Sequence, residues 1–64
     1  MKIKKLEFID DHGRSNYYVT GHSGVERIEE YRPKGEGDKW FYDVFTKDTV
    51  VRVFKFNSVE FSKD

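Results

Sequence analysis

The chain has 64 residues, no cysteine, and 12 basic residues balanced by 12 acidic ones, for a net charge of +0. A chain of this length predicts a single domain, 1–64, that buries only about 60% of the surface its unfolded form exposes. The missing cysteines exclude disulfides and thiolate zinc sites, and they fit a reducing compartment such as the cytoplasm. The charge balance excludes the broad positive field of a nonspecific duplex binder, and no apolar run predicts a membrane span.

The first third of the chain predicts two short strands around a polar turn. Residues 2–9 and 17–20 are rich in apolar, aromatic and β-branched side chains, and "DDHGRSN" between them is typical of a hairpin turn. The turn places Asp10 and Asp11 beside His12, a combination that can assist proton transfer or bind a metal. We interpret these residues as turn formers, because Asp and Gly suit that geometry and His22 lies on a separate loop. We therefore predict no metal site and no cofactor.

The segment "SGVERIEEYR", residues 23–32, has two interpretations. Ser23 and Glu26 have the spacing of a capping box, and Val25 and Ile28 follow at helical spacing, so one short helix at 24–31 fits the pattern. Such a helix has only about two turns and needs docking to be stable. We favour a strand, because the chain then forms an uninterrupted meander with loops of ordinary length.

Residues 39–56, "KWFYDVFTKDTVVRVFKF", predict a hairpin with apolar side chains on both faces. A turn at Lys47 and Asp48 defines its register. One face then carries three cross-strand pairs, Phe45 with Val50, Asp43 with Arg52, and Phe41 with Phe54. The other face carries Val44 with Val51, Tyr42 with Val53, and Trp40 with Lys55. A bulged three-residue loop would shift this register and still leave both faces apolar.

These segments predict an all-β or β-rich α+β fold, namely a small twisted antiparallel meander of four to five strands. One hairpin face covers the core, and the other needs a covering segment or another molecule. The tail "FNSVEF" is too short to cover all of it. We therefore expect a homo-oligomer, or an aromatic ligand surface, to complete the fold, and in an oligomer Phe56, Val59 and Phe61 lie at the interface.

No pattern in the chain predicts catalysis. Ser15, Ser23 and Ser58 lack the context of an activated nucleophile, and the glycines of "KGEGDK" do not have phosphate-loop spacing, so we expect no enzyme. Basic and aromatic residues gather on or beside the first three loops, where they can bind phosphates, stack on bases or anchor protein interfaces. The candidate ligand-binding residues are Arg14, His22, Tyr31, Arg32, Lys34 and Trp40. The structural alternative puts the aromatic rings in the core and the charges on a solvated face.

The stretch from Gly24 to Phe61, and above all its ending "RVFKFNSVEF", resembles the short β-rich proteins encoded by phages and prophages of Gram-positive bacteria. No binding residue carries over from this resemblance. It implies binding by sequestration, because phage proteins of this size look like inhibitors of host proteins or oligomeric sponges for nucleotide immune signals.

Three hypotheses for function follow. In the first, an oligomer captures a small phosphorylated nucleotide-type signal of host defence: Arg14, Arg32 and Lys34 bind phosphate, Trp40 or Tyr31 stacks on the base, and His22 donates a hydrogen bond. In the second, an exposed aromatic surface inhibits a host protein. In the third, the aromatic and basic residues bind single-stranded nucleic acid.

Overall fold

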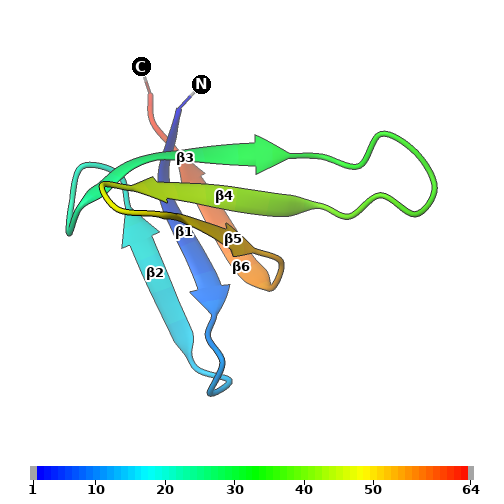
Figure 1. Ribbon diagram of the computed structural model, residues 1–64, viewed down its shortest axis with the longest axis horizontal. Coiled ribbons are helices and arrows are strands. Elements are labelled where there is room, and N and C mark those ends of the chain that lie inside the picture. The colour runs from blue at the N-terminus through cyan, green and yellow to red at the C-terminus, as the bar shows by residue number, and fades with distance from the viewer. Residues whose placement is uncertain (1, 64) are drawn as a thin grey trace.

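The computed structural model describes residues 2–63, which contain strands and no helix. The six strands are β1 (Ile3–Ile9), β2 (Ser15–Val19), β3 (Val25–Tyr31), β4 (Phe41–Thr46), β5 (Val50–Val53) and β6 (Phe56–Phe61). They form two three-stranded antiparallel sheets, with the orders β2-β1-β6 and β3-β4-β5 (Figure 1). The all-β prediction is confirmed, and the strands number six where four to five were expected. Because residues 2–63 form no helix, the described chain has no helical segment that could cross a membrane.

The segment for which strand and helix were both considered is strand β3. Ser23 and Gly24, which precede it, have positive φ angles of 53° and 81°. The Val25 amide donates a hydrogen bond to the His22 carbonyl at 3.0 Å, which closes a tight turn with the dihedral signs of type I′. A helix N-cap residue needs an extended backbone, so Ser23 in the left-handed region cannot cap a helix at 24–31. The turn instead leads the chain from β2 of one sheet into β3 of the other, where β3 pairs antiparallel with β4.

The predicted register of the β4–β5 hairpin is confirmed. Four of the six expected cross-strand pairs are present, namely Tyr42 with Val53, Asp43 with Arg52, Val44 with Val51 and Phe45 with Val50. The other two, Phe41 with Phe54 and Trp40 with Lys55, are not strand pairs, because β5 ends at Val53. Thr46 closes the two-residue turn, because its amide donates to the Thr49 carbonyl at 2.9 Å and its hydroxyl accepts from the Thr49 amide at 3.1 Å. Side chains therefore alternate between an inner and an outer face as the period-two pattern predicts.

The β-prone run at 50–56 is interrupted between the two sheets. β5 ends at Val53, and the chain crosses to the other sheet through Phe54 and Lys55 before β6 begins. The Ile9 amide donates to the Lys55 carbonyl at 3.0 Å and fixes this crossing to the end of β1. The tail therefore pairs with β1, with Val59 opposite Leu6, and extends the β1–β2 hairpin into a three-stranded sheet.

The core lies between the two sheets, whose strands cross at a steep angle in Figure 1. Leu6 in the central strand of one sheet and Val44 in the central strand of the other are fully buried. Among residues 2–63, the buried apolar side chains are Ile3, Leu6, Val25, Ile28, Tyr42, Val44 and Val53. Truncating a buried leucine costs about 2–5 kcal/mol, a large fraction of the stability of a domain this small. One face of each sheet packs against this core, and the other face is open to solvent or a partner.

Candidate functional site

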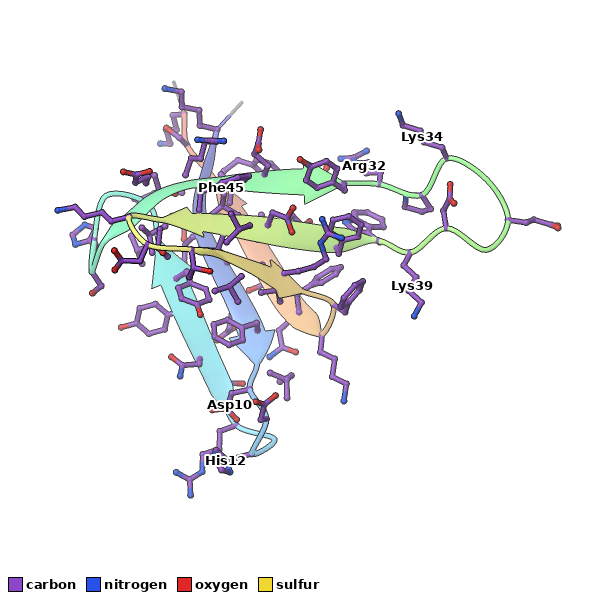
Figure 2. The ribbon with its side chains drawn as sticks, viewed as in Figure 1. Asp10, His12, Arg32, Lys34, Lys39 and Phe45 are labelled. Atoms are coloured by element: carbon purple, nitrogen blue, oxygen red, sulfur yellow. The ribbon has the colours of Figure 1, made fainter. Side chains whose placement is uncertain are left out.

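Four of the six predicted ligand-binding residues lie at one end of the molecule, around the long loop between β3 and β4. Tyr31 ends β3, Arg32 and Lys34 follow it, and Trp40 immediately precedes β4. Figure 2 shows Arg32 and Lys34 on this loop, with Lys39 on its returning side. The loop therefore gathers cationic and aromatic side chains that are up to nine positions apart in the sequence.

The structure does not bring the other two predicted residues to this loop. Arg14 lies in the β1–β2 turn, at the lower tip in Figure 1, and His22 lies in the β2–β3 turn at the opposite end of β3. In the β1–β2 turn the Asp10 carboxylate accepts hydrogen bonds from the backbone amides of His12 and Arg14, each at 2.9 Å. Asp10 therefore acts as a turn former, as expected. A single chain cannot place Arg14, His22 and Arg32 on one small ligand.

Arg32 and Trp40 face each other across the base of the long loop. The guanidinium carbon of Arg32 lies 5.5 Å from the centre of the Trp40 ring, and 42% of Trp40 is exposed. Trp40 also contacts Phe56, and the centres of the two rings are 6.1 Å apart. Arg32 also forms an ion pair with Glu30 while 68% of its own side chain stays exposed. Trp40 and Arg32 therefore form a fixed pair with surface still open to solvent.

Glu30 and Tyr42 were not among the predicted residues, and together they help to fix the position of Arg32. They are directly opposite each other on β3 and β4, and the Tyr42 hydroxyl donates to Glu30 Oε2 at 2.7 Å. Glu30 Oε1 accepts a hydrogen bond from Arg32 Nε. One carboxylate thus joins a buried phenol to an exposed guanidinium and limits the positions that Arg32 can take.

The pKa values of these groups are shifted by the same contacts. The hydrogen bond from Tyr42, and secondarily the contacts with Arg32, lower the pKa of Glu30 below its ordinary value. Burial, followed by the hydrogen bond to Glu30, raises the pKa of Tyr42 to about 12. Glu30 raises the pKa of Arg32 above its ordinary value. At neutral pH the network therefore holds an ionised Glu30, a protonated Tyr42 and a charged Arg32.

The loop itself carries two lysines and a turn held by an acidic side chain. The Asp38 carboxylate accepts a hydrogen bond from the Lys34 backbone amide at 3.1 Å, and the Asp38 amide donates to the Gly35 carbonyl at 3.2 Å. Lys39 reaches toward Phe54, with its ammonium 5.6 Å from the ring centre. Lys34 and Lys39 extend from opposite sides of the loop in Figure 2, and the Lys39 ammonium lies beside Phe54.

A second feature is the solvent-facing side of sheet β3-β4-β5, which we call the outer face. It consists of three rows of side chains that run across the strands: Arg27, Phe45 and Val50; Glu29, Asp43 and Arg52; and Tyr31, Phe41 and Phe54. Tyr31 stacks on Phe41 with ring centres 4.9 Å apart, and the Arg27 guanidinium lies 3.8 Å from the centre of the Phe45 ring. The exposed fractions of Tyr31, Phe54 and Val50 are 42%, 49% and 50%. Two partly apolar rows thus flank one charged row on an open sheet.

The three residues expected at an oligomer interface lie on β6 and differ in their surroundings. Phe56 and Val59 are partly buried and pack against the core of their own chain. Phe56 makes an edge-on contact with Tyr42, with ring centres 4.8 Å apart. Phe61 is 41% exposed. Within this group, Phe61 presents the largest surface to a partner.

Two grooves open where the sheets separate. The larger, of about 740 Å³, lies beside the β1–β2 turn and β5, where Phe8 and Tyr18 stack at 4.8 Å. The smaller lies between β3 and the ends of β1 and β6. Neither groove is lined by Arg32 or Trp40. With 42% of Trp40 and 68% of the Arg32 side chain exposed, the pair at the loop base lies on an open surface.

Comparisons with protein-family models, with curated proteins and with solved structures found no match for this chain. Within residues 2–63 no three His, Asp or Glu side chains gather as a metal-binding group. The arrangement at the loop base can bind an anion through Arg32 and a flat ring through Trp40.

Proposed function

We propose that the protein is a non-enzymatic binding protein that captures a small phosphorylated, nucleotide-type ligand at the base of the β3–β4 loop and withholds it. The observation that carries this proposal is the pairing of Arg32 with Trp40, both of which keep exposed surface. A phosphate and a planar base are the two chemical groups that such a pair recognises together.

Each residue at the loop base has a role that follows from its surroundings. Arg32 donates to phosphate oxygens with the guanidinium N–H groups that Glu30 does not use, since Glu30 accepts from Nε. Trp40 stacks on the base. Tyr31, the alternative platform, lies on the outer face of sheet β3-β4-β5, where it stacks on Phe41. Lys34 adds a second positive charge. Arg14 and His22 contribute only when another copy of the chain supplies them.

Sequestration is the form of action that the surrounding chemistry supports. Glu30 is held in hydrogen bonds by Tyr42 and Arg32, so it is a poor base for activating water or a hydroxyl. The ligand should therefore be released intact when the protein is denatured. Together with the resemblance to phage proteins, this supports capture of a host-defence signal in the host cytoplasm.

The test is calorimetry against a panel of linear and cyclic nucleotides, with the wild-type protein and two matched variants. Arg32→Ala should weaken binding on the order of 10- to 100-fold, while the melting temperature stays nearly unchanged because the side chain is exposed. Arg14→Ala removes the same charge at the far tip and should leave binding by a single chain unchanged. Absence of binding across the panel would reject the proposal.

The outer face supports a second candidate, a protein-directed inhibitor, because exposed aromatic side chains are the usual anchors of protein interfaces. Affinity capture from host lysate with Phe54→Asp as the control tests it.

Single-stranded nucleic acid fits this face less well. Arg52 and Arg27 lie 2.9 and 3.6 Å from the carboxylates of Asp43 and Glu29, so the face has no continuous basic track for a phosphate backbone.

A further inference from the structure

We propose that the outer face of sheet β3-β4-β5 is the contact between two copies of this chain, related by a two-fold axis that runs parallel to β4. The inference goes beyond ligand capture, because Arg32 and Trp40, which carry the ligand proposal, are not in the rows of the outer face, although Tyr31 is, and the contact holds whether or not a nucleotide binds. It rests on the order in which charged and aromatic side chains follow one another across the three strands.

The register fixes which residues meet when two such faces pack together. A two-fold axis along β4 exchanges the positions of β3 and β5, so every side chain on β3 faces its row partner from β5 of the second copy. In the charged row, Glu29 then faces the second copy's Arg52, and the symmetry creates this ion pair twice. In the aromatic row, Tyr31 faces the second copy's Phe54.

The residues on β4 itself lie on the axis and meet their own copies. Phe45 meets Phe45, which places two half-buried rings together. Asp43 also lies on the axis, but the residue is only 5% exposed and its carboxylate already receives two hydrogen bonds from Arg52 of its own chain. The centre of the contact is therefore neutralised before the second copy arrives, and no unpaired charge is buried there.

The alternative two-fold axis, perpendicular to the strands, is disfavoured by charge. It keeps each strand over its own copy, so Glu29 faces Glu29 and Arg52 faces Arg52. Like charges placed opposite each other across an interface are repulsive. The distribution of charges thus selects one of the two ways in which the strands can be aligned.

The same contact explains why the β4–β5 hairpin is apolar on both faces. Its inner face, with Tyr42 and Val44, covers the core, and its outer face, with Phe41 and Phe45, covers the second copy. Sheets packed face to face in this way form a sandwich about 10 Å thick. The net charge of +0 adds no long-range repulsion between the copies.

Cysteine cross-linking tests the axis directly, because the natural chain contains no cysteine. Phe45→Cys places the only thiol on the proposed axis, so mild oxidation should give a disulfide-linked dimer of the kind formed between the two sheets of a sandwich. Glu29→Cys lies on the same face and off that axis, and it should stay monomeric under denaturing electrophoresis. The reverse pattern would assign the perpendicular axis, and no cross-link in either variant would reject a dimer through this face.

Sedimentation provides the second measurement and does not depend on an introduced thiol. Phe54→Asp should raise the dissociation constant of the dimer by at least about tenfold, because an aromatic anchor becomes a charge in the buried contact. Phe61→Asp is the matched control: it makes the same change at an aromatic residue of similar exposure on the other sheet, and it should leave the dimer unchanged. A wild-type chain that stays monomeric, or a dimer broken by Phe61→Asp alone, would overturn the inference.

Chemical-shift dispersion confirms that each variant is folded. Nucleotide binding by the monomeric Phe54→Asp variant tests the ligand site separately.

Discussion

Arg52 donates two hydrogen bonds to Asp43 across the β4–β5 hairpin. Its Nε donates to Asp43 Oδ1 at 2.9 Å and its Nη2 donates to Oδ2 at 3.1 Å, while its guanidinium carbon lies 4.1 Å from the centre of the Phe41 ring. The bond to Asp43 raises the pKa of Arg52 above its ordinary value. The two residues are exact register partners on a face otherwise rich in aromatic rings. Their pairing therefore fixes the hairpin register with a polar contact as well as an apolar one.

The first prediction concerns this pair. Asp43→Asn keeps the shape of a side chain that is 5% exposed but removes its charge, so it should cost about 1–3 kcal/mol of unfolding free energy. Glu60→Gln makes the same chemical change in the exposed Lys4–Glu60 pair, whose atoms are 3.6 Å apart, and should cost less than about 0.5 kcal/mol. Urea denaturation measures both. Equal losses in the two variants would mean that the Asp43 pair is no stronger than a surface contact.

The second prediction concerns the order in which the backbone opens. β1 and β4 are the central strands of their sheets and exchange hydrogen bonds on both sides, whereas β2, β3, β5 and β6 are edge strands. Amide hydrogen exchange should therefore be slowest in Ile3–Ile9 and Phe41–Thr46. In β5 the amides that donate to β4 should exchange slowly and should alternate with amides that exchange fast. The reason is that only one edge of β5 is hydrogen-bonded to another strand. Uniformly slow exchange throughout Val50–Val53 would require another strand, or a second copy, along that edge.

The sequence predicted the β4–β5 hairpin well because its determinants are local. A two-residue turn and strict alternation on both sides of it leave few registers in which Asp43 meets Arg52 and Phe45 meets Val50. The change of sheets at Phe54 and Lys55 could not be predicted in the same way. The alternating pattern continues through this point, and the crossing depends on a bond between Lys55 and Ile9, which lie far apart in the sequence.

The candidate site was predictable to the extent that it lies on one hairpin. Tyr31 pairs with Phe41, so Arg32 and Trp40 necessarily flank the start and end of the same loop. The opposition of Glu30 and Tyr42 follows from the same register, but it could be found only after residues 25–31 were known to form a strand. His22 is kept away from this loop by the length of β3, which lies between them. The position of Arg14 depends on how the two sheets pack, and no local pattern encodes that packing.

The third prediction is an acid dependence of stability that comes from Glu30. Its pKa in the folded chain is lowered from 4.5, so its ionised form stabilises the fold at pH values above 4.5. That contribution is lost as the pH falls through the lower, folded value. Glu30→Gln should therefore be less stable than the wild type at neutral pH, and the difference should shrink on acidification below 4.5. Thermal denaturation as a function of pH measures this difference, and a gap that widens toward acid would contradict the assigned direction.

The fourth prediction uses the opposite end of the pH scale and the partner of Glu30. Burial and the hydrogen bond to Glu30 raise the pKa of Tyr42 from 10.0 to about 12 in the folded chain. A raised folded value favours the protonated form, so its stabilising contribution is complete below pH 10 and is lost as the pH rises toward about 12. The difference in tyrosinate absorbance between wild type and Tyr42→Phe should therefore titrate near 12 in the native protein and near 10 in denaturant.

Glu30→Gln removes one of the two causes of the raised Tyr42 pKa. It should move the native titration downward, while burial keeps it above 10. A native difference spectrum that already titrates near 10 would show that the phenol is neither buried nor bonded to the Glu30 carboxylate, and the support behind Arg32 and Trp40 would be lost with it.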